Sequence, residues 1–146
     1  MIALIQRVSS AAVHIEGAEV AAIGKGVLAL IGVERGDGDA QAARLAERVV
    51  AYRIFADAQG KMNLSLKDIG GGLLAVPQFT LAADTASGLR PSFSSAAAPA
   101  VGEALFVKFA EKAAELVHVA SGRFGADMKV SLVNDGPVTF WLQSRS

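Results

Sequence analysis

Residues 77 to 81, Pro77-Gln78-Phe79-Thr80-Leu81, form the first segment that could carry out chemistry. A proline within a buried strand cannot donate a backbone hydrogen bond, so it favours a bulge or a strand end after which the next N–H groups point outward. Such N–H groups can stabilise an oxyanion, and the Gln78 amide and the Thr80 hydroxyl can orient a carbonyl group or a water molecule. Because the same alternation is typical of an ordinary strand, the segment alone leaves both interpretations open.

The second candidate segment is Asn134-Asp135-Gly136-Pro137-Val138-Thr139. Asp-Gly between two strands is normally a tight hairpin turn, and this is the simpler interpretation. Pro137 allows another one, because a cis Gly136–Pro137 bond, the less common isomer, would aim two neighbouring carbonyl groups in nearly the same direction. Two rigid backbone acceptors suit an ammonium group, and their rigidity suits steric exclusion. Both interpretations stay open.

The other polar residues are less informative. Arg7 is either a solvated charge or a brace that donates to an acceptor-rich loop. His14 and His118 have no acidic residue nearby in the sequence to complete a relay, so we interpret both as structural. The chain has no cysteine, which excludes thiolate chemistry, and two distant histidines leave little for an imidazole-based metal site. We therefore expect no metal ion and no cofactor.

The composition of the chain limits the class of protein to which these segments can belong. The 146 residues carry 14 basic and 14 acidic side chains, so a nucleic-acid partner must be held by a local site rather than by bulk charge. With 52% apolar residues the chain can bury a sizeable core, and we expect one domain over residues 1–146. The longest apolar run, Val27 to Val33, is too short to cross a bilayer. We predict a cytoplasmic protein with no membrane partner.

Hydrophobic periodicity predicts the elements that position the two segments. Helical spacing predicts one helix from a cap at Asp39 to about Ile54, and a second from Pro99 to near Ala120. Strand patterns cover residues 2–8, 11–16, 18–23, 26–33, 73–81, 128–132 and 138–142. The first two of these predicted strands are joined at Ser9-Ser10, and the fifth is interrupted by Pro77. The continuous run at 26–33 is typical of a central strand covered on both faces. Two main helices and mostly antiparallel strands make a mixed α/β (α+β) fold.

Taken together, the two segments resemble those of the D-aminoacyl-tRNA deacylases, also called D-tyrosyl-tRNA deacylases. That family carries Ser-Gln-Phe-Thr-Leu mid-chain and Asn-x-Gly-Pro-Val-Thr near the C-terminus. Further similarity lies in order along the chain at Ile5-Gln6-Arg7-Val8, Lys61-Met62-Asn63, Arg90-Pro91-Ser92-Phe93 and Gly122-Arg123-Phe124. One departure is Pro77, where the family usually has serine, so any role of that hydroxyl is lost. The resemblance implies a curved, barrel-like sheet with two main helices.

The resemblance also implies a function and a set of site residues. It implies a homodimer that hydrolyses the ester between a D-amino acid and the 3′-terminal adenosine of tRNA, including glycyl-tRNA mischarged on tRNA(Ala). Gln78, Phe79 and Thr80 would form the catalytic segment. Gly136 and Pro137, joined by a cis bond, would reach into the partner's pocket and exclude L-amino acids, with Arg7 and Asn134 beside them.

Elementary chemistry is compatible with this function. An ester is an activated acyl group, so a positioned water and the N–H groups of Phe79 and Thr80 can suffice without a side-chain nucleophile. Thr80 as nucleophile is an alternative, but no base to activate it is visible. A second alternative is a non-catalytic dimeric module that binds a nucleotide or an RNA end, and a third is a general carboxylesterase.

Overall fold

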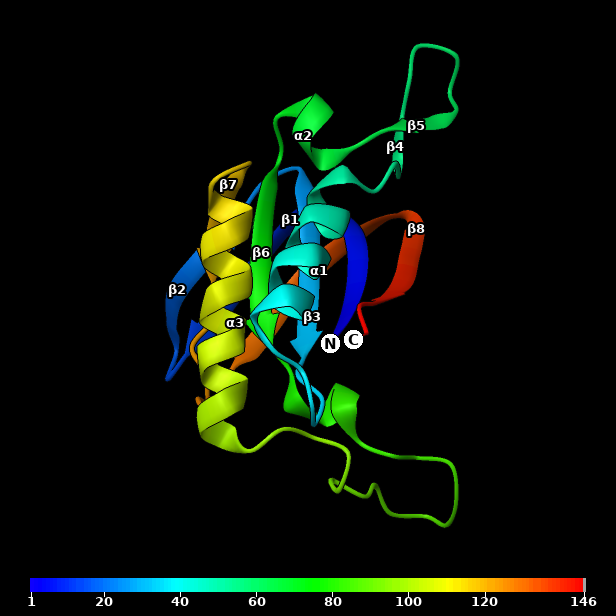
Figure 1. The fold of residues 1–146 in the computed structure, drawn as a ribbon. Coiled ribbons are helices and arrows are strands. Elements are labelled where there is room, and N and C mark those ends of the chain that lie inside the picture. The colour runs from blue at the N-terminus through cyan, green and yellow to red at the C-terminus, as the bar shows by residue number, and fades with distance from the viewer. Residues whose placement is uncertain (146) are drawn as a thin grey trace.

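The structure, a computed structural model, describes residues 1–145 (Figure 1). Its elements are, in chain order, β1 (Ile2–Ile15), β2 (Ala18–Ile23), β3 (Gly26–Gly32), α1 (Asp39–Ala51), β4 (Phe55–Ala56), β5 (Met62–Leu64), α2 (Leu66–Ile69), β6 (Gly72–Pro77), the 3-10 helix η1 (Phe79–Ala82), α3 (Pro99–Ala114), β7 (His118–Ser121) and β8 (Lys129–Gln143). No helix within residues 1–145 is both long enough and apolar enough to span a membrane.

One strongly curved sheet forms the centre of the molecule. Its strand order is β2-β1-β3-β6-β7, and β8 pairs with β1. The β1 strand is antiparallel to β2, β3 and β8, whereas β3, β6 and β7 run parallel. The sheet curls so far that Ile23, at the end of β2, packs against Gly72, at the start of β6. This nearly closed sheet confirms the expected mixed α/β fold with mainly antiparallel pairing.

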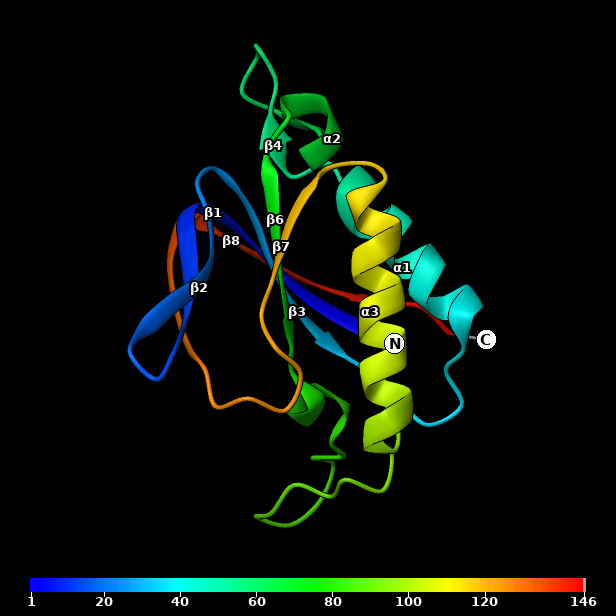
Figure 2. The same cartoon turned by 90° about the vertical axis from the view of Figure 1, so that its left-hand side faces the viewer.

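Hydrophobic cores lie on both faces of the central strands. Helices α1 and α3 lie side by side on one face, while β2 and the first part of β8 curve away from them on the other side (Figure 2). Alternate residues of β3 face the two sides, because side chains alternate along a strand: Val27, Ala29 and Ile31 join the helix-side core, and Leu28 joins the core inside the curl. The predicted central strand, covered on both faces, is confirmed.

Two predicted breaks in strands are wrong. Ser9-Ser10 does not separate two strands, because β1 continues through it with only register shifts relative to β8 between Gln6 and Ser10. The Asp135-Gly136 pair is not a hairpin turn either. The residues on both sides of it belong to β8 and pair with β1, not with each other, because β1 is long enough to serve both halves.

The helix ends also differ from the predictions. The first helix stops at Ala51, since Tyr52 adopts an extended conformation (φ −67°, ψ 131°) that leads toward β4. Its cap is Gly38, not Asp39, and the N–H of Gly38 donates to the side chain of Gln41 (2.7 Å). The last helix stops at Ala114 rather than near Ala120, because the following residues form β7 beside β6.

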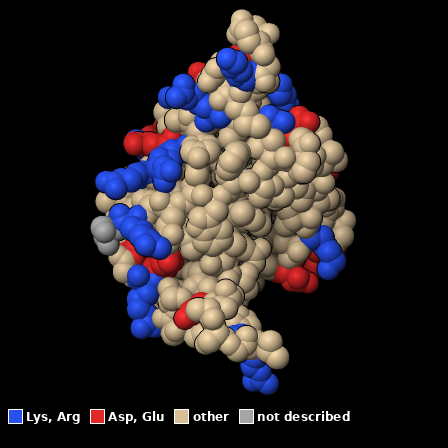
Figure 3. Space-filling view, turned by 90° about the vertical axis from the view of Figure 1, so that its right-hand side faces the viewer, with Lys and Arg blue, Asp and Glu red and all other residues tan. Residues whose placement is uncertain are grey.

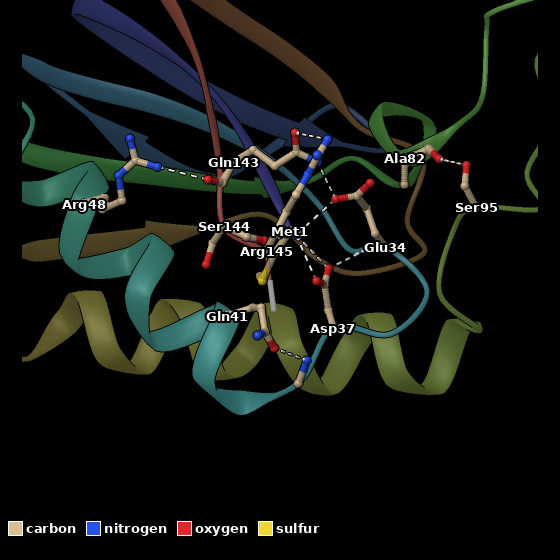
Figure 4. A network of polar contacts seen from close by, with 11 residues as sticks. Met1, Glu34, Asp37, Gln41, Arg48, Ala82, Ser95, Gln143, Ser144 and Arg145 are labelled. Carbon is tan, nitrogen blue, oxygen red and sulfur yellow. Dashed lines mark hydrogen bonds and ion pairs between the residues drawn. The ribbon is translucent and has the colours of Figure 1, made fainter.

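A polar network joins three distant parts of the chain (Figure 4). The buried α-amino group of Met1 forms ion pairs with Glu34 and Asp37 and donates to the carbonyl of Ser144 (2.7 Å). The side chain of Gln143 donates to Glu34 (2.7 Å). These contacts fix the connection between β3 and α1 against the start of β1 and the end of β8.

Candidate active site

The mid-chain segment lies where β6 ends. The predicted strand over residues 73–81 is wrong after Pro77, and the alternative of a strand end at this proline is confirmed. The N–H of Gln78 donates to the carbonyl of Ile31 (2.8 Å), and the chain then turns into η1. Gly32 makes room for this turn, since a Cβ atom there would lie 2.9 Å from the Cβ of Leu81.

The backbone N–H groups of Phe79 and Thr80 are the first two of η1. Backbone bonding in this turn begins one residue later, where the N–H of Leu81 donates to the carbonyl of Gln78 (3.2 Å). Within residues 1–145 the N–H groups of Phe79 and Thr80 have no hydrogen-bond partner, as expected for the first residues of a helical turn. Phe79 is 59% exposed and Thr80 is also exposed, so the start of η1 lies at the surface of the chain.

The side chains of Gln78 and Thr80 contact each other. The Gln78 Nε2 atom donates to the Thr80 hydroxyl oxygen (2.6 Å), which fixes the orientation of both groups. In the described part of the chain, no carboxylate, imidazole or amine is bonded to this hydroxyl. Within the described residues Thr80 therefore lacks a bonded base of the kind that a nucleophilic hydroxyl requires.

An apolar cavity of about 270 Å³ opens beside Phe79. Pro77 and Phe79 form one wall, and Pro99 and Phe124 contribute to the lining from the start of α3 and from the segment after β7. Gly102 of α3 faces the ring of Phe124, and a Cβ atom there would lie 3.4 Å from the Cζ atom. Phe79, which carries one of the candidate donors, thus borders an apolar recess large enough for a flat ring.

The second segment bulges out of β8. Thr139 pairs with Gln6 and Asn134 pairs with Val8, so the four residues 135–138 lie opposite Arg7 alone. Gly136 has a φ of +143°, and a Cβ atom there would lie 2.6 Å from the Cγ2 atom of Val138, so only glycine fits. The Gly136–Pro137 peptide bond is cis.

Two side chains hold this bulge. Arg7 donates through Nε to the carbonyl of Asp135 (2.9 Å) and through its guanidinium to the carbonyl of Ile54 (2.7 Å). Asn134 closes the neck, because its side-chain oxygen accepts the N–H of Val138 (2.7 Å) and its amide donates to the Thr139 hydroxyl (2.9 Å). Arg7 is thus the brace that one of its two interpretations predicts.

The structure of one chain does not bring the two segments together. Pro77 pairs with Ile31 near the end of β3, whereas Arg7, which faces the bulge, pairs with Val27 near its start. The two segments are offset by four residues along the strands and by three strand spacings across the sheet, from β6 through β3 and β1 to β8. These offsets together correspond to a distance on the order of 15–20 Å. The six predicted residues from the two motifs, with Arg7, therefore form two separate clusters.

Two aromatic residues at the first cluster were not assigned to the site from the sequence. The ring of Phe93, in the long loop before α3, lies 5.3 Å from the ring of Phe79, centroid to centroid. Phe124 lines the apolar cavity. Both belong to short motifs that carried the family resemblance, Arg90-Pro91-Ser92-Phe93 and Gly122-Arg123-Phe124, and this was the only indication available.

Comparison with known proteins decides the family. A sequence profile described as "D-Tyr-tRNA(Tyr) deacylase" matches residues 4–143. The chain belongs to this family. A D-aminoacyl-tRNA deacylase of Thioalkalivibrio sulfidiphilus is 65% identical over 145 residues, covering 98% of this chain and 97% of the relative. One of Vibrio cholerae is 60% identical over 144 residues, covering 99% and 100%.

Solved structures agree with the deacylase fold. A structure named "c-Myc DNA Unwinding Element Binding Protein" superposes with a TM-score of 0.95 at 33% identity and covers 100% of both chains. A probable eukaryotic D-amino acid tRNA deacylase superposes with a TM-score of 0.81 at 18% identity, covering 97% of both chains, which shows a common fold. At the level of the family, the expectation of an aminoacyl-tRNA hydrolase is confirmed.

Proposed function

We propose that this chain hydrolyses the ester of D-aminoacyl-tRNA and releases the free D-amino acid and tRNA. Its family and its most similar relatives support the substrate class. The single observation that carries the chemistry is the pair of unpartnered N–H groups at Phe79 and Thr80, exposed beside an apolar cavity. Two such donors stabilise the negative charge that develops on the carbonyl oxygen when water attacks an ester.

The reaction needs no nucleophile from the protein. Water adds to the carbonyl carbon, the bond from this carbon to the ribose oxygen breaks, and the proton passes to the departing ribose oxygen. The neighbouring ribose 2′-hydroxyl of the substrate assists in activating the water. This route fits Thr80, whose hydroxyl is held by Gln78 and has no base bonded to it within residues 1–145.

The 3′-terminal adenosine occupies the cavity beside Phe79. Its flat base suits a recess lined by Phe79, Phe124 and two prolines, since bases stack on aromatic side chains. Recognition then depends on stacking and backbone contacts, which agrees with a formal net charge of zero. Binding should accordingly depend less on salt than that of a basic RNA-binding protein.

Chiral selection comes from a second copy of the chain. Because the two segments of one chain lie on the order of 15–20 Å apart, the Gly136–Pro137 segment acts on the Phe79–Thr80 segment of a partner. The homodimer therefore contains two composite sites. Each protomer contributes the donors to one site and the Gly136–Pro137 wall to the other.

The outer face of β8 supports this assembly. Val133 and Trp141 are 56% and 52% exposed on this strand. In Figure 3 the middle of the face on this side is free of charged side chains, which gather around its rim. An apolar centre with a charged rim is typical of an interface between protein chains.

The wall selects by rejection. Backbone carbonyls of the Gly136–Pro137 segment face the α-amino group, and the same rigid backbone occupies the space that an L side chain needs. Arg7 and Asn134 are positioning residues that keep the wall in place. A wall of main chain does not read side-chain identity, so the enzyme accepts many D-amino acids and also glycyl-tRNA, including glycine mischarged on tRNA(Ala). The enzyme acts in the cytoplasm, where tRNA is charged. A single domain carries both segments.

A second candidate is a non-catalytic dimeric module that binds a nucleotide or an RNA end. The superposition with a protein named for binding a DNA element favours it, and Pro77 stands where the family usually has serine. This alternative uses the same cavity but gives no turnover.

Release of the amino acid from charged tRNA separates the two functions. Purified protein at micromolar concentration is mixed with D-tyrosyl-tRNA or L-tyrosyl-tRNA, and free amino acid is followed in time. Rapid release from the D-substrate, with the L-substrate intact, is the expected result. Absence of release from both would overturn the hydrolase and leave the binding module, whereas release from simple aryl esters would indicate a general carboxylesterase.

A further inference from the structure

A second hollow lies on the other side of Phe79. It has a volume of about 610 Å³ and is lined by Arg35, Phe79, Phe93, Ala97, Pro99 and Val101, among others. This volume is within the usual range of small-molecule sites. Phe79, Ala97 and Pro99 also line the smaller cavity, so the two spaces are neighbours with a shared wall.

The walls of this hollow are held in place by backbone contacts. The N–H of Arg35 donates to the carbonyl of Ser95 (2.9 Å), and the N–H of Ala97 donates to the carbonyl of Val33 (3.0 Å). The Ser95 hydroxyl also donates to the carbonyl of Ala82 in η1 (2.7 Å; Figure 4). The segment that follows Phe93 is thereby fixed against η1 and against the residues that directly follow β3.

The chemistry of the lining favours an anion joined to a flat ring. The exposed rings of Phe79 and Phe93 are tilted by 43° and offer faces for stacking. Arg35 is the only charged residue among those that line the hollow. Its guanidinium has no ion pair or hydrogen bond within residues 1–145, whereas the carboxylate of neighbouring Glu34 is occupied by Met1 and Gln143.

We propose that this hollow binds the penultimate nucleotide of the tRNA, with its base against Phe93 and Phe79 and the phosphate that joins it to the terminal adenosine against Arg35. The inference rests on the proposed function, because it takes the terminal adenosine to occupy the adjoining cavity. The single-stranded 3′ end then passes over the shared wall. Stacking on aromatic rings and a guanidinium on phosphate are the usual means of holding unpaired RNA.

Small nucleotides test the subsite without any reaction. Calorimetric titration compares adenosine, adenosine 5′-monophosphate and the dinucleotide cytidylyl-(3′→5′)-adenosine on the wild type. The dinucleotide should bind about tenfold more tightly than adenosine. Arg35→Gln should weaken the two phosphate-bearing ligands and leave adenosine unchanged. Phe93→Leu should weaken only the dinucleotide.

Arg44→Gln is the matched control for Arg35→Gln. Arg44 lies exposed on α1 and does not line either space, so its loss removes the same charge without touching the hollow. This variant should bind all three ligands as the wild type does. Equal weakening by Arg35→Gln and Arg44→Gln would show a general charge effect and overturn the subsite.

Kinetics keep this inference separable from the proposed function. The wild type is assayed on a D-aminoacyl ester of adenosine and on the same ester of the dinucleotide. Phe93→Leu and Arg35→Gln should lower kcat/KM about tenfold for the dinucleotide ester and leave that for the adenosine ester unchanged. Equal kcat/KM on both esters, for wild type and variants alike, would overturn the subsite, whereas absence of turnover by the wild type would overturn the hydrolase.

Discussion

The two segments of the site are built in opposite ways. The bulge around Gly136 is held at both of its ends, by Arg7, which donates to the Asp135 carbonyl, and by Asn134, whose side-chain oxygen accepts the N–H of Val138. The turn at Phe79 and Thr80 leaves two backbone donors without partners in the described part of the chain.

The difference corresponds to two physical tasks. Exclusion of a substrate by a clash requires a wall that does not yield, so its own polar groups are best bonded internally. Stabilisation of a developing charge requires donors that no other group occupies. In the proposed function, the first cluster therefore gains from unsatisfied N–H groups, and the second gains from the bonds at Asp135 and Val138 that hold its backbone in place.

The largest expected effect comes from removing one of the free donors. Phe79→Pro deletes the N–H of residue 79, which is the first residue of η1, a position where the missing N–H of proline breaks no helical hydrogen bond. We expect kcat on D-tyrosyl-tRNA to fall about 10²- to 10³-fold below that of Phe79→Ala, which loses the ring but keeps the donor. Single-turnover kinetics measure this ratio, and equal rates for the two variants would remove this N–H from the mechanism.

The next effect concerns the wall. Gly136→Ala places a Cβ atom 2.6 Å from Val138 and 3.1 Å from the Arg7 guanidinium, so the bulge must move. We expect the ratio of kcat/KM for D- over L-tyrosyl-tRNA to fall by at least about tenfold, because a displaced wall admits the L side chain.

Gly60→Ala is the control for that variant. Gly60 also has a positive φ of +78°, but a Cβ atom there meets no atom within 4 Å. Its variant shares the backbone strain without a clash and should keep the wild-type D/L ratio. A folded Gly136→Ala protein that still rejects L-tyrosyl-tRNA would place the wall elsewhere.

A smaller effect is expected from the brace. Arg7→Lys keeps the charge, but one ammonium group cannot reach the carbonyls of both Asp135 and Ile54. We expect the free energy of unfolding to fall by about 1–2 kcal/mol in urea titrations and the D/L ratio to fall severalfold. Arg44→Lys, on the exposed face of α1, should change neither quantity; a wild-type D/L ratio in Arg7→Lys would mean that the wall needs no brace.

Thr80→Val should have a modest effect on catalysis. The substitution keeps the shape and the backbone N–H of residue 80 but removes the hydroxyl that Gln78 holds. We expect kcat to fall by less than about tenfold, since this hydroxyl only orients water. A loss of four or more orders of magnitude, the result for a nucleophile, would contradict the water mechanism.

The smallest effect lies outside both segments. The backbone N–H and the hydroxyl of Ser65 donate to Asp68 and hold the pKa of that carboxyl below its usual value. Because this pKa is lower in the folded than in the unfolded chain, the carboxylate stabilises the fold above the unfolded pKa, and the contribution disappears as the pH falls through the folded pKa.

Urea unfolding of Asp68→Asn tests this contribution. The variant should be slightly less stable than the wild type at about pH 7, and this difference should shrink as the pH falls below the usual pKa of an aspartate, with the D/L ratio unchanged. A stability difference that grows on acidification would contradict the assigned direction.

Local patterns predicted much of the fold. The start of the last helix at Pro99, the central strand covered on both faces and the end of a strand at Pro77 depend on residues close in sequence, and all three are confirmed. Whether the residues of the two segments form the site remains a prediction, although neighbours within each motif contact each other, as Gln78 does Thr80 and Asn134 does Thr139.

Long-range pairing limited the rest. The bulge at residues 135–138 exists because both halves of β8 find β1, and a dipeptide such as Asp135-Gly136 does not reveal that choice. The separation of the two clusters depends on the order of strands in the sheet. Phe93 joins Phe79 only because the long loop folds back, which no local pattern specifies.

Hybrid dimers test the central claim, a site shared between two chains, most directly. Phe79→Pro and Gly136→Ala protomers with different affinity tags are co-expressed, and the mixed dimer is isolated by both tags. Our account predicts that one of its sites carries both substitutions and the other carries none. The mixed dimer should then hydrolyse D-tyrosyl-tRNA at about half the wild-type rate with wild-type rejection of L-tyrosyl-tRNA. Because sites confined to single chains would also leave about half of the D-activity, the L-substrate decides: hydrolysis of L-tyrosyl-tRNA by the mixed dimer, as by the Gly136→Ala parent, would contradict the shared site.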